Sequence, residues 1–169
     1  TWAAKTLRAV PRAADRRQTL LDYARLSCQA FRVPDGEVDA VADKMWPYFQ
    51  KKFEIPYKPL LAGGVKFYAA LGNHDDAAIQ RNYKLFNMNG ERFYTFRPKL
   101  GVRFFSLDSN YMDRAQLQWL EKELAASGSD WKIMYFHHPI YSSGGRHGSD
   151  TALRDQLEPL FLKHGVDVV

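Results

Sequence analysis

The pattern of hydrophobic and polar residues changes near residue 35. Before that point, the stretch 12–31 is rich in arginine and alanine and places one apolar stripe on a helix, which predicts a helical segment. The stripe consists of Leu20, Ala24, Ser27 and Phe31. Val33-Pro34-Asp35-Gly36 reads as a turn, and a second helical stretch is expected over residues 37–53, interrupted or restarted at Pro47.

From residue 56 onward, strand-like runs alternate with helical ones. Residues 65–71 form a short β-rich run bounded by glycines, and 131–136 form another. Residues 92–96 and 102–107 predict an antiparallel pair, because turn residues separate them. A last strand is expected to begin at residues 166–169.

Two helices are predicted between these strands. Asp113 and Gln116 have the spacing of a capping box before a helix whose apolar face holds Leu117, Leu120 and Leu124. A second helix is expected over residues 150–164, kinked near Pro159 and ended by Gly165. Strands, a hairpin and alternating helices together predict an α/β architecture with a mixed sheet.

Charge is distributed unevenly along the 169 residues. The net charge is +5, and residues 1–32 carry seven positive and two negative side chains, so the remainder is balanced at 17 of each. The basic character therefore belongs to the N-terminal segment. We expect residues 1–40 to form a basic helical segment and residues 41–169 to form the folded domain.

Composition excludes several classes of protein. A hydrophobic fraction of 46% argues against disorder, and no stretch approaches the roughly 18 apolar residues of a membrane span. Arginines interrupt every candidate for a signal peptide near the N-terminus. The lone Cys28 excludes a disulfide framework and a cysteine-rich zinc site, but it does not fix the compartment.

The first candidate for chemistry is Leu71-Gly72-Asn73-His74-Asp75, directly after a predicted strand. An amide oxygen such as that of Asn73 can ligate a divalent cation, and His74 can donate a proton or hydrogen bond to a phosphate or leaving-group oxygen. Such a tetrapeptide is also a common polar turn, so its context decides between the two interpretations.

The second candidate supplies that context. The predicted strand 131–136 runs into His137-His138-Pro139, and His147 follows beyond a Ser/Gly-rich stretch at 142–145. Imidazole is the commonest ligand of zinc and iron-group metals, and a flexible loop would let His147 reach a bound anion. Three of five histidines lie here and a fourth lies in the Gly-Asn-His-Asp turn, which favours a site over isolated structural histidines.

Gly72-Asn73-His74-Asp75, followed some sixty residues later by a strand and His-x-Pro, resembles the calcineurin-like metallophosphoesterase superfamily. The segment His-x-Pro-x-Tyr-Ser…His-Gly at 137–148 is similar to its purple acid phosphatase-like branch. The resemblance covers about residues 43–169. It implies a fold in which mixed β-sheets are sandwiched by helices (αββα), here incomplete and preceded by the N-terminal helical segment.

The resemblance also implies roles for individual residues. Asn73 and His137 would ligate the second of two metal ions (Fe, Mn or Zn), and Asn73 would lie near the substrate. His74 would hold the phosphate and stabilise or protonate the leaving oxygen, with Asp75 orienting it or capping the turn. His147 would contact the phosphate-ester substrate. His138 is expected to be structural, and hydroxide generated at the two metals would attack phosphorus.

Other motifs of that superfamily are not found in the sequence. Residues 1–60 contain no Asp-x-His and no Gly-Asp, and no Gly-His-x-His follows the expected strand at 166–169. Two ligands cannot hold a dinuclear centre. The sequence therefore suggests a fragment of a longer protein or an altered reading frame or start.

Four functional hypotheses remain open at this stage. The leading one is a phosphomonoesterase of the acid-phosphatase kind, and a phosphodiesterase or nucleotidase of the same fold is the close alternative. A non-catalytic scaffold is the third. The fourth, binding of nucleic acid or an acidic membrane by residues 1–32, is less favoured than a solvated extension. The oligomeric state and natural substrate are not predicted, and relatives of this branch are often secreted or periplasmic.

The incomplete ligand set leads to a test. We expect the purified 169-residue chain to hydrolyse p-nitrophenyl phosphate with Mn²⁺, Zn²⁺ or Fe little faster than its His74→Ala variant does. A rate well above that of the variant would show that the residues present suffice for catalysis.

Overall fold

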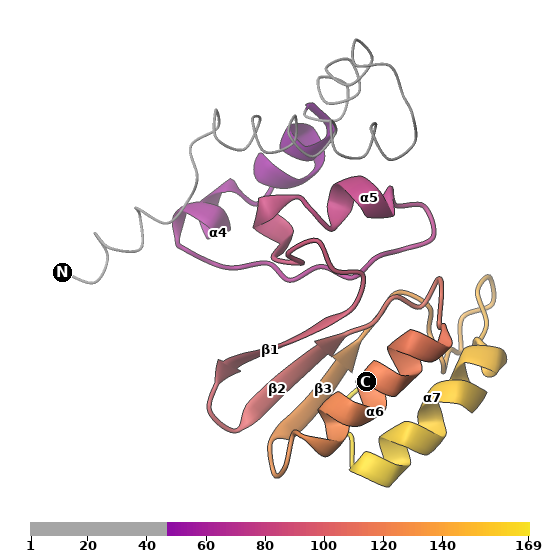
Figure 1. The fold of residues 1–169 in the computed structure, drawn as a ribbon. Coiled ribbons are helices and arrows are strands. Elements are labelled where there is room, and N and C mark those ends of the chain that lie inside the picture. The colour runs from indigo at the N-terminus through magenta and orange to yellow at the C-terminus, as the bar shows by residue number, and fades with distance from the viewer. Residues whose placement is uncertain (1–46) are drawn as a thin grey trace, which may run out of the picture. The chain divides into compact units, whose positions relative to one another are not determined.

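The computed structural model describes residues 47–169 (Figure 1). The predicted helix at 12–31, the turn at 33–36 and most of the predicted helix at 37–53 lie outside the described residues, as does the basic segment 1–40. The chain divides into two compact units. One holds the described residues through Tyr68 together with Asp76–Gly90, and the other holds Ala69–Asp75 and Glu91–Val169.

The first unit is built from short helical segments around aromatic side chains. Residues 47–49 are α-helical and continue into the π-helix η2 (Gln50–Glu54), so the part of the predicted helix 37–53 that lies within the described residues is helical. The other segments are α4 (Lys58–Ala62), α5 (Ala77–Gln80) and η3 (Lys84–Phe86). Phe49 and Tyr83 stack in its core with ring centroids 4.2 Å apart.

The second unit contains a three-stranded mixed sheet (Figure 1). β1 (Tyr94–Lys99) pairs antiparallel with β2 (Val102–Ser106), and β2 pairs parallel with β3 (Trp131–Tyr135). The predicted hairpin and mixed sheet are therefore confirmed. The predicted strand at 166–169 appears as one parallel bridge, in which Val168 lies opposite Ile133.

Two helices cover one face of this sheet. They are α6 (Arg114–Ala125) and α7 (Thr151–His164), and α7 continues through Pro159. Gly165 ends α7 at a φ of +62°, a left-handed conformation that glycine adopts at little cost. The buried core between helices and sheet consists of Phe105, Leu107, Leu120, Leu124, Met134, Ile140, Leu153, Leu157 and Phe161. No helix within residues 47–169 is long and apolar enough to cross a membrane.

The expected strand at 65–71 is not formed. These residues have no regular secondary structure. Side chains occupy carbonyls that a ladder would use: Ala69 accepts hydrogen bonds from Tyr94 Oη at 2.7 Å and from Ser106 Oγ at 3.2 Å. A β-rich composition makes a strand only where a neighbouring backbone is available, and the described residues offer none here.

The predicted capping box is half correct. The Asp113 carboxylate accepts the N–H of Gln116 at 2.8 Å, which caps α6. That bond, followed by the contact with Arg92, holds the pKa of Asp113 below its ordinary value, so the cap stabilises α6 above the acid range and weakens as acid protonates Asp113. The Gln116 side chain does not return to the Asp113 N–H. It is fully buried and binds the preceding loop instead.

The Gln116 amide makes three hydrogen bonds to the loop after β2. Its oxygen accepts from the Asp108 N–H at 2.8 Å, and its nitrogen donates to the carbonyls of Asp108 at 3.0 Å and Tyr111 at 2.9 Å. A buried amide used in this way replaces backbone partners that an irregular loop lacks. Gln116 thus fixes the path of the chain between the sheet and α6.

We expect Gln116→Ala to lower the free energy of unfolding by about 2–3 kcal/mol, because it leaves the buried Asp108 N–H without an acceptor. Urea denaturation of the 169-residue chain measures this change. The matched control is Gln118→Ala on the exposed face of the same helix, which should cost less than about 0.5 kcal/mol. Equal losses in both variants would show that the Gln116 hydrogen bonds contribute nothing specific.

Candidate active site

A tight turn over Gly72–Asp75 presents the first two candidate residues. The Asp75 N–H donates to the Gly72 carbonyl at 3.1 Å, and the Asp75 carboxylate accepts the Gly72 N–H at 2.8 Å. These two bonds close the turn and leave the side chains of Asn73 and His74 exposed. Asp75 therefore shapes the turn that carries His74, and no hydrogen bond between these two side chains occurs in the described part of the chain.

His137 lies directly against this turn. It follows the end of β3, and its Nε2 is 3.0 Å from the side-chain oxygen of Asn73. A Cβ atom at position 72 would meet the His137 ring at 3.2 Å, which is tighter than an ordinary contact. Gly72 therefore permits this close approach of the ring to the backbone, and a Cβ there would require the ring to shift by a few tenths of an ångström.

The Asn73–His137 pair fits two adjacent ligands of one metal ion. Ligand atoms about 2.0–2.1 Å from a metal lie roughly 3–3.4 Å apart when their bonds make an angle of 90–110°. The Oδ1–Nε2 distance of 3.0 Å falls at the lower end of that range. Within residues 47–169 no group of three His, Cys, Asp or Glu side chains could hold a metal, so this pair by itself does not make a metal site.

His138 is tied to the loop after β2. Ser109 Oγ accepts the backbone N–H of His138 at 3.1 Å and lies 2.9 Å from its Nδ1. Ser109 is itself buried. These bonds agree with the structural role expected for His138, and they fix the chain at the point where His137 faces Asn73.

Hydrogen bonds within the loop 139–150 hold the segment that carries His147. The Asp150 N–H donates to the Pro139 carbonyl at 2.8 Å and closes the base of the loop. Ser142 Oγ accepts the N–H of Gly144 at 3.0 Å and donates to the carbonyl of His147 at 2.9 Å. The Ser142 N–H donates to Ser149 Oγ at 2.8 Å, so the two arms of the loop are joined.

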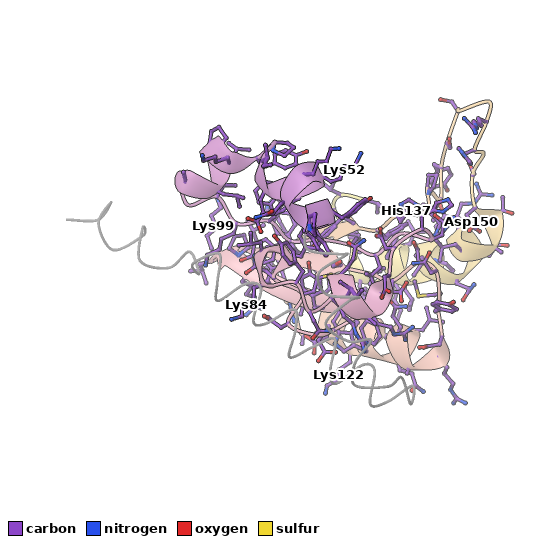
Figure 2. All side chains as sticks on the ribbon, turned by 90° about the horizontal axis from the view of Figure 1, so that it is seen from above. Lys52, Lys84, Lys99, Lys122, His137 and Asp150 are labelled. Carbon is purple, nitrogen blue, oxygen red and sulfur yellow. The ribbon has the colours of Figure 1, made fainter. Side chains whose placement is uncertain are left out.

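The turn, the end of β3 and this loop enclose a cavity of about 680 Å³. Figure 2 shows His137 and Asp150 close together at the end of the sheet, where the loop leaves it. The cavity is lined by Asn73, His74, His137, His138, Pro139, Arg146, His147, Gly148, Ser149 and Asp150. Four histidines, one arginine and one carboxylate are among the lining residues, so groups that can donate a hydrogen bond to an anion outnumber the acidic group.

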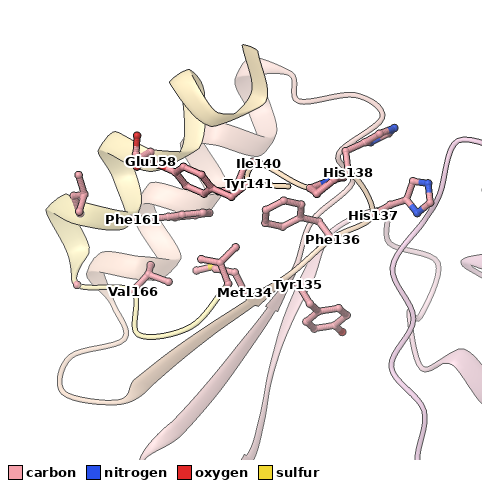
Figure 3. Close-up of a pocket in the computed structure, with 14 residues that line it drawn as sticks. Met134, Tyr135, Phe136, His137, His138, Ile140, Tyr141, Glu158, Phe161 and Val166 are labelled. Carbon is pink, nitrogen blue, oxygen red and sulfur yellow. Dashed lines mark hydrogen bonds between the residues drawn. The ribbon is translucent and has the colours of Figure 1, made fainter. Parts of the chain in front are cut away.

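A second pocket of about 580 Å³ adjoins the first along His137, His138 and Pro139 (Figure 3). It lies between β3 and the C-terminal half of α7, and its walls are mainly apolar. Tyr141 donates a hydrogen bond to Glu158 there, which raises the pKa of the tyrosine hydroxyl above its ordinary value. With Glu158 as its charged lining residue, this pocket is poorly suited to an anion.

The structure thus brings Asn73, His74, His137 and His147 to one cavity, although they come from three separate segments. Asp75 is in the same turn but does not line the cavity. Sequence reasoning missed several residues that support the site, because hydroxyls and glycines in loops carry no distinctive pattern. They are Gly72 as a contact of His137, Ser109, Ser142, Ser149 and Arg146.

A substitution of Ser142 tests whether its hydrogen bonds stabilise the loop that carries His147. We expect Ser142→Ala to speed hydrogen exchange of the Gly144 amide by about two- to tenfold, because it removes a bond worth roughly 0.5–1.5 kcal/mol. NMR exchange measurements on the 169-residue chain provide the readout. Ser143→Ala is the matched control, since no hydrogen bond of the Ser143 hydroxyl occurs in the described residues. An unchanged hydrogen-exchange rate of the Gly144 amide in Ser142→Ala would show that the Ser142 hydroxyl does not stabilise the loop.

Known proteins with similar sequences are acid phosphatases. The 169-mer is 28% identical to tartrate-resistant acid phosphatase type 5 of Oryctolagus cuniculus over 160 aligned residues, covering 76% of this chain and 48% of that protein. It is 29% identical to the proteins of the same name from Rattus norvegicus and Homo sapiens, over 149 and 150 residues. Those alignments cover 70% of this chain and 45% and 46% of the relatives. The chain spans about half the length of the curated relatives it matches.

A comparison of the chain with models of protein families gives a match over most of the sequence. The sequence model described as calcineurin-like phosphoesterase matches residues 33–169, a range that includes the Gly72–Asp75 turn and the loop 139–150. The resemblance inferred from the two motif blocks is therefore confirmed. This chain belongs to the calcineurin-like phosphoesterase family.

Proposed function

We propose that this chain forms the phosphate-facing part of a phosphomonoesterase site. The observation that carries the proposal is the 3.0 Å approach of His137 Nε2 to Asn73 Oδ1 at a cavity that His74 and His147 also line. Family membership and the acid phosphatase relatives support hydrolysis of phosphate esters as the reaction.

In this proposal Asn73 and His137 would be two of the ligands of one metal ion in a dinuclear centre that contains Fe, Mn or Zn. The metals would neutralise charge on the phosphate oxygens and lower the pKa of bound water. Gly72 keeps the His137 ring close to the turn, since a Cβ there would press on the ring at 3.2 Å. The hydrogen bonds of Ser109 fix the chain immediately after His137.

The other two histidines act on the substrate. His74 is exposed on the closed Gly72–Asp75 turn and donates a hydrogen bond or proton to the phosphate or the leaving oxygen. His147 reaches the ester from the loop whose backbone Ser142 holds. Asp75 serves by closing the turn through the Gly72 N–H, which orients His74 relative to Asn73.

A phosphodiesterase or nucleotidase of the same fold is the second candidate. We favour the monoesterase because His147 lines the cavity and would be an additional donor for the terminal oxygens of a monoester, which carry more charge than those of a diester. A non-catalytic scaffold would keep the fold but bind neither metal nor phosphate.

Binding to the 169-residue chain tests the proposal. Calorimetry should detect Zn²⁺ binding that His137→Ala weakens by at least about tenfold, because a ligand is lost. Gly72→Ala should weaken it by about tenfold through displacement of the His137 ring. Gly145→Ala is the matched control, since an added Cβ there meets nothing within 4 Å, and Zn²⁺ affinity should be unchanged.

Phenylphosphonate, which cannot be hydrolysed, then reports on the anion site. We expect it to bind in the presence of Zn²⁺ and to bind more weakly to His74→Ala. Failure of the wild-type chain to bind both Zn²⁺ and phenylphosphonate would contradict the proposal and favour the scaffold.

A further inference from the structure

Arg146 lies in the loop 139–150, next to His147, and its side chain lines the histidine cavity. Three other arginines of the same unit have carboxylate partners: Arg92 pairs with Asp108 and Asp113, Arg97 with Asp130 and Arg103 with Glu123. Arg114 and Arg154 have no such partner among the described residues, but neither of them lines the cavity. Within residues 47–169, no carboxylate pairs with Arg146. Its guanidinium is therefore available to a ligand.

Among the described residues, the carboxylate that lines the cavity forms no ion pair with this guanidinium. The lining carboxylate is Asp150, and its Oδ1 accepts the N–H of Leu153 at 2.9 Å as the cap of α7. The cavity volume of about 680 Å³ is larger than one phosphate group needs, so it also has room for the group to which the phosphate is attached. Arg146 shares that space with the proposed phosphate-binding histidines.

The loop that carries Arg146 is held by its own hydrogen bonds. Ser142 bonds the His147 carbonyl and the Gly144 N–H, and Ser149 Oγ bonds the Ser142 N–H. Gly144 allows this approach, because a Cβ there would lie 3.2 Å from the His147 carbonyl oxygen. A preformed loop lowers the entropy cost of using its side chains in binding.

We propose that Arg146 binds a second oxyanion on the leaving-group side of the substrate, so that the site prefers phosphate esters carrying an additional carboxylate or phosphate. This inference rests on the proposed function, because it requires the first phosphate to occupy the histidine site. The planar guanidinium donates two parallel hydrogen bonds to a carboxylate or phosphate, which a lysine cannot reproduce. Arg146 is thus a specificity-determining residue.

The test compares non-hydrolysable ligands that differ in the second group. Phenylphosphonate, 4-carboxyphenylphosphonate and 1,4-phenylenediphosphonate are titrated calorimetrically into the 169-residue chain with Zn²⁺ at low ionic strength. The wild-type chain should bind at least one of the doubly charged ligands about three- to tenfold more tightly than phenylphosphonate, and comparing the two shows which oxyanion is preferred. Added salt should reduce the preference.

Variants separate Arg146 from general electrostatics. Arg146→Gln should remove the preference while changing phenylphosphonate affinity less than about twofold, and Arg146→Lys should restore only part of it. The matched control is Arg114→Gln, which removes an exposed arginine of α6 that does not line the cavity, and it should keep the preference. Circular dichroism verifies that the variants are folded.

The possible failures are distinguishable. Equal affinities of the wild-type chain for all three ligands would overturn the role of Arg146, and so would a preference that survives in Arg146→Gln. In either case, phenylphosphonate binding that depends on His74 would still support the proposed function. Absence of phenylphosphonate binding to the wild-type chain overturns both.

Discussion

The parallel ladder between β2 and β3 is the constraint on which the candidate site depends. Ser106 lies opposite Tyr135, and the Leu107 N–H donates to the Tyr135 carbonyl at 3.2 Å, so both strands end at one edge of the sheet. The residues that follow therefore emerge together, and Ser109 can bind His138. Burial of Phe105 and Met134 beneath α6 and α7 fixes this register, because a shift of one residue would turn both side chains away from the core.

Beyond the strand ends, side-chain hydrogen bonds replace regular structure as the source of order. Gln116 binds the loop after β2, Ser109 binds the chain after β3, and Ser142 binds the loop of His147. A loop held by such bonds keeps a fixed conformation while its polar side chains point to a cavity, as a binding site requires. The rigid sheet and these polar contacts together determine where the histidines lie.

The cavity combines two chemically different walls. Asn73 and His137 offer an oxygen and a nitrogen 3.0 Å apart, which suits a cation, while the opposite loop offers His147 and Arg146, which suit an anion. A phosphate ester bridging metal and loop would satisfy both walls. The adjoining apolar pocket, with Glu158 at its edge, lacks this complementarity and explains why the anion is assigned to the histidine cavity.

Local pattern alone determined α6, α7 and the β1–β2 hairpin, because periodicity and caps depend on residues close in sequence. Short motifs also singled out Asn73, His74, His137 and His147, which line one cavity in the structure. Tertiary structure decided what depends on distant partners. Residues 65–71 remained outside the sheet, and the Ala69 carbonyl accepts hydrogen bonds from side chains of β1 and β2 rather than from a neighbouring backbone. The Gln116 side chain binds a buried loop instead of the expected helix cap. Gly72 contacts the ring of His137, which lies 65 positions later in the chain. These contacts join residues that are far apart in the sequence, and such residues compete as partners only once the chain has folded.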